Sequence, residues 1–294
     1  MTSDLGLTMT PALSPDGKLI AYASDRGGQG NLDLWVQQVR GGATIRLTHE
    51  AFDNYSPSFS PDGQTIAFRS EREGGGNYTV STLGGGSRKM APLGRGPRFS
   101  PDGKWIAYWT GTDAIGMNRL SFPQPGAEKI YIVPSGGGAP KEIRSDFASA
   151  QYAIWTPDSK HLLFLGNRDP KILLEPANNL SPGSESVDWW VTPIDGGTAI
   201  ATGANAAFRG LGLPSVSQSP DAWTDDGKGV LVSAAFAYTQ NIWRLPISTG
   251  NWKISGTPQR LTFGTAMDIQ SSVGGAVRLR SQAWEKVWMS GACL

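Results

Sequence analysis

Residues 57–68, which read Pro-Ser-Phe-Ser-Pro-Asp-Gly-Gln-Thr-Ile-Ala-Phe, contain the four-residue segment Ser60-Pro61-Asp62-Gly63 between two short apolar stretches. Pro61 fixes φ near the value that the second position of a turn requires, the Asp62 carboxylate can accept hydrogen bonds from nearby amides, and Gly63 can adopt a positive φ. Apolar residues alternate with a period of two on both sides, as in half-buried strands. The stretch therefore predicts a β-hairpin.

The same turn recurs along the chain. Two further copies and two looser ones are Ser14-Pro15-Asp16-Gly17, Ser100-Pro101-Asp102-Gly103, Thr156-Pro157-Asp158-Ser159 and Thr224-Asp225-Asp226-Gly227. Each hairpin is followed by two more strand-like segments separated by glycines, so each repeat is interpreted as four strands, A to D. A repeat of this kind through the whole chain indicates one closed array of sheets rather than two domains.

We predict an all-β fold, a six-bladed β-propeller of four-stranded antiparallel blades, as a single domain over residues 1–294. The expected blades are approximately 10–49, 57–92, 97–144, 153–202, 221–263 and 270–290. The sixth unit lacks the Pro-Asp pair and a D strand. Residues 1–4 resemble the end of a D strand, so they are expected to complete this blade and remove the free sheet edges. A frayed terminus is the alternative.

Composition narrows the class of protein. With 294 residues, of which 39% are hydrophobic and 17% charged, the chain can bury a large core. Net charge is +1 and the 26 basic residues are dispersed, which argues against nucleic acid as a partner. Cys293 is the single cysteine, so an internal disulfide and a cysteine metal site are excluded.

The sequence also bears on localisation. It has no run of about 18 apolar residues and no basic start followed by an apolar segment. We therefore expect a soluble, monomeric chain without membrane insertion or an export signal of its own. Its compartment stays open, because it would be periplasmic as part of a longer exported protein and cytoplasmic otherwise.

The repeats of this chain resemble the TolB-type β-propeller repeat, a relative of the WD repeat. The shared pattern begins with Ser-Pro-Asp-Gly and continues with an Ile-Ala-Phe type strand, an aromatic C strand, a Gly-Gly turn and Leu-Thr. The match is best over residues 11–48 and 55–92. The resemblance implies the propeller fold. Such repeats are found in a periplasmic partner of the Tol-Pal system, downstream of bacterial Ser/Thr kinase domains, and ahead of the hydrolase domain of prolyl-oligopeptidase-like peptidases. Because these proteins differ in function, the resemblance leaves the function of this chain open.

Antiparallel strands place the A–B and C–D turns at one end of every blade and the B–C and D–A connections at the other. The long insertions, 111–128, 167–187 and 203–220, all belong to the second class, so we expect that face to bind a partner. It carries aromatic and arginine side chains typical of binding hot spots. The candidate binding residues are Tyr55, Arg119, Phe122, Phe147, Tyr152, Arg168, Phe208 and Arg209. Packing of the aromatic rings onto their own loops is the alternative.

Other recurring residues have structural interpretations. The turn aspartates occur once per blade, so we expect them to cap turns rather than to converge on a metal. Arg26, Arg72 and Arg168 follow B strands beside a carboxylate and are expected to form ion pairs between neighbouring loops. The C-strand tryptophans are expected to pack between adjacent sheets; they are Trp35, Trp190, Trp243 and Trp288.

Motifs for chemistry are missing from the sequence. We find no G-x-S-x-G, P-loop, H-E-x-x-H or C-x-x-C, and the two histidines, His49 and His161, are not spaced as metal ligands. We therefore predict no catalytic residue, metal or cofactor. The favoured function is a non-catalytic module that binds a protein or peptide, within a larger protein or assembly such as a TolB-like envelope protein or a kinase-linked sensor. The alternative is the propeller domain of a prolyl-oligopeptidase-like serine peptidase whose catalytic domain is absent from this chain.

Overall fold

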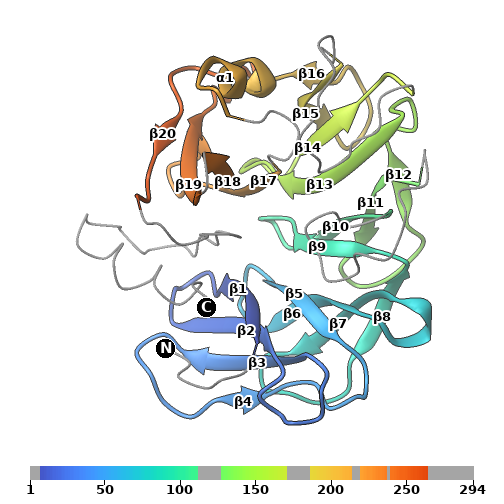
Figure 1. Ribbon diagram of the computed structural model, residues 1–294. Helices are drawn as coiled ribbons and strands as arrows, with labels where there is room; N and C mark the ends of the chain where they lie inside the picture. The colour runs from blue at the N-terminus through green and yellow to red at the C-terminus, as the bar shows by residue number, and fades with distance from the viewer. Residues whose placement is uncertain (1–6, 112–126, 171–185, 214–218, 237–238, 264–294) are drawn as a thin grey trace.

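The computed structural model describes residues 7–111, 127–170, 186–213, 219–236 and 239–263. These residues form five four-stranded sheets arranged as blades around a common centre (Figure 1). Within each blade the strands follow one another in chain order, and neighbouring strands are antiparallel. The prediction of an all-β propeller of four-stranded antiparallel blades is therefore confirmed.

The strand bounds are as follows. Blade 1 consists of β1 (Thr8–Leu13), β2 (Leu19–Ser24), β3 (Asp33–Gln38) and β4 (Ile45–Arg46). Blade 2 consists of β5 (Asn54–Phe59), β6 (Thr65–Ser70), β7 (Gly76–Ser81) and β8 (Arg88–Pro92), with a short 3₁₀ turn, η1 (Arg72–Gly74), before β7. Blade 3 consists of β9 (Arg95–Phe99), β10 (Trp105–Trp109), β11 (Ile130–Pro134) and β12 (Lys141–Ile143).

The remaining blades contain the one α-helix of the described residues. Blade 4 consists of β13 (Ser149–Trp155), β14 (His161–Asn167), β15 (Val187–Pro193) and β16 (Ile200–Ala201), followed by α1 (Ala204–Gly210). Blade 5 consists of β17 (Pro220–Trp223), β18 (Gly229–Phe236), β19 (Thr239–Pro246) and β20 (Gln259–Arg260). The first strand of each blade is the inner strand, and consecutive inner strands contact one another from β1 to β17.

The number of blades differs from the prediction. The described residues form five blades, not six. Residues 270–290 and 1–4, to which the sixth blade was assigned, lie outside the described residues. That assignment depended on strand patterning without the Pro-Asp turn that identifies the other units, so it was the least constrained of the six.

The Pro-Asp turns have one geometry. In blade 2, the Ser60 hydroxyl donates to Asp62 Oδ1 (2.5 Å), the Gln64 amide donates to the same oxygen (3.0 Å), and the Thr65 amide donates to Ser60 Oγ (3.0 Å). Gly63 has a φ of 70°, where a side chain would be strained. The equivalent carboxylates accept the same pair of bonds; they are Asp16, Asp102, Asp158 and Asp226. The predicted capping role of the aspartates is confirmed.

Acid should weaken these turns. The Ser60 hydroxyl and the Gln64 amide hold the pKa of Asp62 below its usual value. Because the folded-state pKa is lowered, the stabilisation is present above about pH 4 and is lost as the pH falls through the lowered value. We expect D62N to cost about 1 kcal/mol or less at pH 7, because solvent screens an exposed turn, and to cost less at about pH 2.

Urea unfolding at the two pH values measures the effect of D62N. The matched control is D195N, which changes an exposed aspartate in the connection after β15. It should have little effect at either pH. An equal cost of D62N at both pH values would contradict the proposed role of the ionised carboxylate.

The two faces of the ring are distinguished by their connections. After strand C, the Val39 amide donates to the Lys18 carbonyl and the Ser135 amide donates to the Lys104 carbonyl (2.8 and 2.9 Å). The C–D connections thus meet the A–B turns on one face, which we call the SPDG face. The B–C and D–A connections form the long-loop face. The prediction that long connections avoid the SPDG face is wrong for residues 247–258, which place the Trp252 ring 5.0 Å from that of His161.

Inner strands begin earlier than predicted because each contains a β-bulge. In β5 the register shifts between Tyr55 and Ser58, and Ser56 has a φ of 55°. The other inner strands shift register at equivalent positions. A bulge inserts an extra residue and interrupts the alternation of side chains. The sequence pattern therefore ended at the bulge, while the hydrogen-bonded strand continues beyond it.

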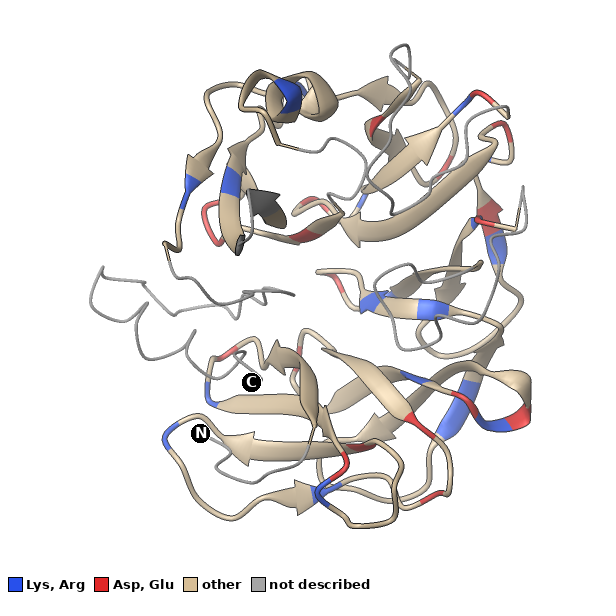
Figure 2. Ribbon diagram, viewed as in Figure 1, with Lys and Arg blue, Asp and Glu red and all other residues tan. Residues whose placement is uncertain are grey.

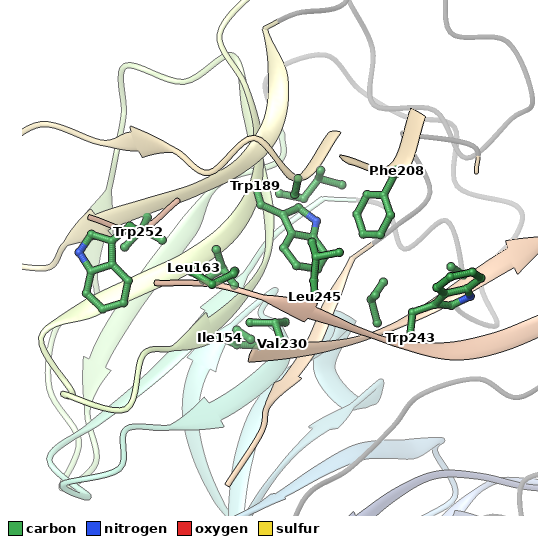
Figure 3. Close-up of a cluster of buried hydrophobic side chains, with 14 of the residues drawn as sticks. Ile154, Leu163, Trp189, Phe208, Val230, Trp243, Leu245 and Trp252 are labelled. Atoms are coloured by element: carbon green, nitrogen blue, oxygen red, sulfur yellow. The ribbon is translucent and has the colours of Figure 1, made fainter. Parts of the chain in front are cut away.

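The largest hydrophobic cluster lies between blades 4 and 5 (Figure 3). Trp189 and Phe208 are 2% and 1% exposed, and their rings meet edge to face with centroids 5.5 Å apart. Trp190 and Trp243 are each 8% exposed and belong to clusters, so their predicted packing is confirmed. Trp35 is half-buried, and Trp288 lies outside the described residues.

The arginines after the B strands pack on aromatic rings. The guanidinium of Arg72 lies 3.8 Å from the Tyr78 ring centroid and pairs with Glu50 at 2.9 Å, while Arg168 lies 4.5 Å from the Trp190 ring. Arg26 likewise stacks over Trp35. The expected ion pairs between loops form for Arg72 and for Arg168, which pairs with Asp146 at 3.8 Å, but in neither case is the carboxylate the adjacent one. Cation–π stacking on the C strand, which the sequence interpretation missed, fixes these side chains.

Candidate functional site: the central channel

The inner strands line an open cavity of about 580 Å³ at the centre of the propeller. We call it the central channel. Its lining extends from Pro15 and Pro61 in the SPDG turns to Tyr55 and Tyr152 near the long-loop face. Ligand pockets of proteins commonly have volumes of about 300–1,000 Å³. The channel is therefore large enough to hold a ligand or a short peptide segment.

The bulges shape the wall of the channel. Thr10, Ser56, Gly96 and Tyr152 have φ values of 52°, 55°, 53° and 55°. All four line the channel at the bulges of β1, β5, β9 and β13. Non-glycine residues occupy this left-handed region rarely and at a cost of about 1–3 kcal/mol, which the surrounding sheet must offset. The Tyr152 ring lies 4.7 Å from the Trp109 ring, beside the channel.

A buried polar cluster supports the long-loop end of the channel. Glu71 accepts hydrogen bonds from Arg69 Nε and Nη2 (3.0 and 2.7 Å) and from the Tyr55 hydroxyl (2.5 Å). Arg95 Nη1 donates to the Tyr55 oxygen (3.2 Å), and its Nε donates to the Gly111 carbonyl (2.8 Å). The cluster therefore connects blades 2 and 3 and holds the first residue of the 111–128 insertion.

The protonation states of this cluster follow from its surroundings. Burial, and then the hydrogen bond to Glu71, raises the pKa of Tyr55 to about 12. Burial alone would raise the pKa of Glu71, but the bonds from Arg69 and Tyr55 outweigh it, and the pKa is lowered. Glu71 is therefore ionised and Tyr55 neutral near pH 7, so the cluster holds a fixed charge pattern.

Further along the channel, opposite charges come from two blades. Among the five inner strands, β9 alone contains arginines, Arg95 and Arg98, and β17 alone contains an acidic residue, Asp221 (Figure 2). Arg98 and Asp221 both line the channel. Burial lowers the pKa of Arg98, and the Asp221 carboxylate opposes this shift. The Ser233 hydroxyl donates to Asp221 Oδ2 at 2.7 Å.

The predicted binding residues fall into three groups. Tyr55 and Tyr152 line the channel. Phe147 and Phe208 are each 1% exposed and belong to the cores of blades 3–4 and 4–5, so no partner can reach their rings in this fold. For Phe147 and Phe208, the structure shows the alternative interpretation, in which the aromatic rings pack within the protein.

The arginines among the predicted binding residues differ from these phenylalanines in exposure. Arg209 is exposed on α1. The Arg168 side chain is 42% exposed and lies over the rings of Phe147 and Trp190. Arg119 and Phe122 lie outside the described residues. Whether the predicted set binds a partner stays a prediction.

Two functional candidates were missed. Phe52, 48% exposed, lies in the D–A connection between blades 1 and 2 on the long-loop face. Arg98 carried a signal, because aligned repeats place small or apolar residues where it stands, such as Ala12 and Ala222. An arginine at a position that is otherwise small or apolar identifies a side chain that packing does not explain.

The described residues contain no group of three or more His, Cys, Asp or Glu side chains that could hold a metal ion. His161 Nδ1 lies 2.8 Å from Asp158 Oδ2, and its ring packs on Trp252, while His49 is exposed. Within the same part of the chain, no helix has the length and hydropathy to cross a bilayer. The channel thus offers arginine, tyrosine and backbone groups for binding.

Comparison with known proteins agrees with this geometry. A family model described as the TolB beta propeller domain matches residues 1–122. TolB from Acinetobacter baumannii superposes with a TM-score of 0.57 at 18% identity, over 83% of this chain and 53% of that one. The chain therefore has the fold of a TolB-like β-propeller, and the family match itself covers residues 1–122. A putative TolB from Agrobacterium tumefaciens gives a TM-score of 0.50 at 21% identity, over 65% of this chain and 63% of that one.

Peptidases also contain this fold. The acylaminoacyl peptidase of Pyrococcus horikoshii gives a TM-score of 0.52 at 13% identity, covering 92% of this TolB-like chain and 42% of the peptidase. The chain thus spans less than two thirds of the length of each of these relatives. Comparison with curated protein sequences gives no match. At such identities the structural likeness establishes the fold alone.

Proposed function

We propose that this TolB-like propeller is a non-catalytic module that binds a protein or peptide at the long-loop end of its central channel. The observation that carries the proposal is the combination of a channel of about 580 Å³ with Tyr55 and Tyr152 at that end. Phe52, Arg168 and Arg209 lie exposed on the same face. Tyrosine, arginine and other large side chains supply much of the energy of protein interfaces.

The revised binding surface differs from the one predicted from sequence. Phe147 and Phe208 are withdrawn from it because their rings are buried. Phe52 takes their place as an exposed aromatic ring on the long-loop face. Leu83, 89% exposed, lies in the connection between β7 and β8 on the SPDG face and is an exposed apolar residue outside the proposed surface.

We expect F52A to weaken partner binding by about 2 kcal/mol, the loss that is typical of a hot-spot residue. The phenyl ring would lose apolar contact area that the free chain exposes to water. The matched control L83A removes a comparable exposed side chain from the opposite face and should leave affinity unchanged. A partner captured with the chain as bait and then purified is titrated calorimetrically with both variants.

Two results would contradict the assignment of the face. One is loss of affinity in L83A with normal binding by F52A. The other is equal loss in both variants, which would point to a general effect on the fold. Melting temperatures of the two variants, which should match that of the unmodified chain, separate these cases.

We also propose that the ring has room for a sixth blade. Inner strands of consecutive blades contact one another from β1 to β17, whereas no comparable contact joins β17 to β1 in the described part of the chain. This open junction between blades 5 and 1 supports the six-blade prediction. The chain would then function as one closed ring within a larger protein or assembly, such as an envelope protein or a kinase-linked sensor.

A second candidate function is the propeller domain of a peptidase. Coverage of 92% of this chain by the Pyrococcus peptidase favours it. The coding sequence around the chain distinguishes the two, because a downstream α/β-hydrolase domain would support the peptidase. Esterase and peptidase assays of the purified chain should show no turnover under either candidate, so turnover would contradict both.

A further inference from the structure

We propose that Arg98, inside the central channel, binds a carboxylate carried by an acidic side chain of the partner's peptide. This inference rests on the proposed function and names the chemistry of the ligand. Arg98 lies on β9, in the segment Pro97-Arg98-Phe99 that lines the channel. Position and charge, rather than exposure on the outer surface, single it out.

The guanidinium of Arg98 is poorly satisfied by the protein. Nη1 donates to the neighbouring Pro97 carbonyl at 3.3 Å, a long bond. A guanidinium has five N–H groups. Within the described residues no ion pair joins Arg98 to Asp221 or to another carboxylate. Arg98 is half-buried, and a partly desolvated charge with so few partners is costly, so an anion entering the channel would find donors that are already in place.

Arg95, the other arginine that lines the channel, has donors occupied by the protein, and this difference supports the assignment of Arg98. Arg95 Nε and Nη1 are occupied by the Gly111 carbonyl and the Tyr55 oxygen. Arg95 therefore positions the mouth, whereas Arg98 keeps most of its donors for a ligand. The Arg98 backbone has a separate structural role, because its carbonyl accepts a hydrogen bond from Trp155 Nε1 at 2.9 Å. That contact is independent of the Arg98 side chain.

The surrounding charges favour a carboxylate over a doubly charged phosphate. A guanidinium binds carboxylates through two parallel hydrogen bonds. Asp221 lies near enough to raise the pKa of Arg98 and would repel a second negative charge at the same place. A singly charged carboxylate gains the bidentate contact with the smaller repulsion.

A peptide is the source that the channel shape favours. Its lining runs from the long-loop end, where Tyr55 and Tyr152 lie, to Pro15, Pro61 and Pro157 in the SPDG turns. An extended segment entering beside the tyrosines would present its side chains to the inner strands on the way to Arg98. Free small carboxylates share the chemistry and serve as a separate arm of the test.

The test pans the purified chain against a phage-displayed library of random dodecapeptides. We expect the enriched peptides to share an Asp or Glu at one position. Replacing that residue by Asn or Gln in a synthetic, fluorescein-labelled peptide should lower its affinity at least about tenfold, as for a hydrogen bond to a charged group. R98Q should lower the affinity of the acidic peptide by a similar factor.

A double-mutant cycle decides whether the two groups meet. In R98Q, the acidic peptide and its amide version should bind equally, because the interaction is already lost. The matched control is R40Q, which removes an exposed arginine from the connection between β3 and β4 and should bind like the unmodified chain. R98Q should retain the melting temperature, since Trp155 bonds to the backbone of residue 98.

Several outcomes would overturn the inference. These are enriched peptides without a shared acidic residue, additive losses in the cycle, or a failure to enrich any peptide. Displacement of the labelled peptide by millimolar succinate, absent in R98Q, would assign the site to a free carboxylate instead. If F52A weakens partner binding while R98Q does not, the proposed function stands and the role of Arg98 falls.

Discussion

Replacing Glu71 with glutamine is expected to lower the free energy of unfolding by about 3 kcal/mol, because it leaves a buried arginine without its counter-charge. The Arg69 side chain is 4% exposed and donates two hydrogen bonds to Glu71. Glutamine keeps the shape of the residue but loses its charge and turns an amide donor toward Arg69 or Tyr55. Guanidinium chloride unfolding, followed by tryptophan fluorescence, measures the change.

The matched control is E73Q in the same connection. Glu73 pairs with Lys89 at 2.8 Å, but its side chain is 68% exposed, and water takes over the interaction when the charge is removed. E73Q should unfold like the unmodified chain. Equal destabilisation by the two substitutions would show that the connection as a whole, rather than the buried charge pair, supports the channel mouth.

Replacing Phe208 with alanine is expected to cost about 3–5 kcal/mol of stability. The ring is 1% exposed and packs edge to face on Trp189 in the cluster between blades 4 and 5 (Figure 3). Alanine would leave a cavity that the two sheets cannot close, since their backbones are fixed by hydrogen bonds. Thermal and denaturant unfolding of F208A provide the measurement.

R209A is the control for F208A. Arg209 is the next residue on α1 and is exposed, so its removal should leave stability unchanged. If F208A folds as stably as the unmodified chain but loses partner binding, Phe208 belongs to the interface and the packing shown here is wrong. Destabilisation with normal affinity of the remaining folded protein supports a purely structural role.

Resemblance to TolB-like repeats identified the architecture, while the recurring Ser-Pro-Asp-Gly segments identified its turns. Neither the resemblance nor the turns identified the residues that line the channel. Phe147 and Phe208 were placed correctly in connections of the long-loop face, yet their rings are buried. A loop residue can point outward or fold back onto a sheet with the same sequence spacing. Only the packing of Trp190 beside Phe147 and of Trp189 beside Phe208 resolves this.

The sequence by itself determined the turns and, through their recurrence, the blades. Ser60, Asp62 and Gly63 interact with groups within five residues, so their geometry depends on local chain conformation. The tertiary structure alone decided that Arg98 and Asp221 share a channel and that Arg95 meets Tyr55. Those residues are far apart in the chain, and their meeting depends on the bulges and on the angle between successive blades. Such distances are set by the packing of whole sheets, which no local pattern encodes.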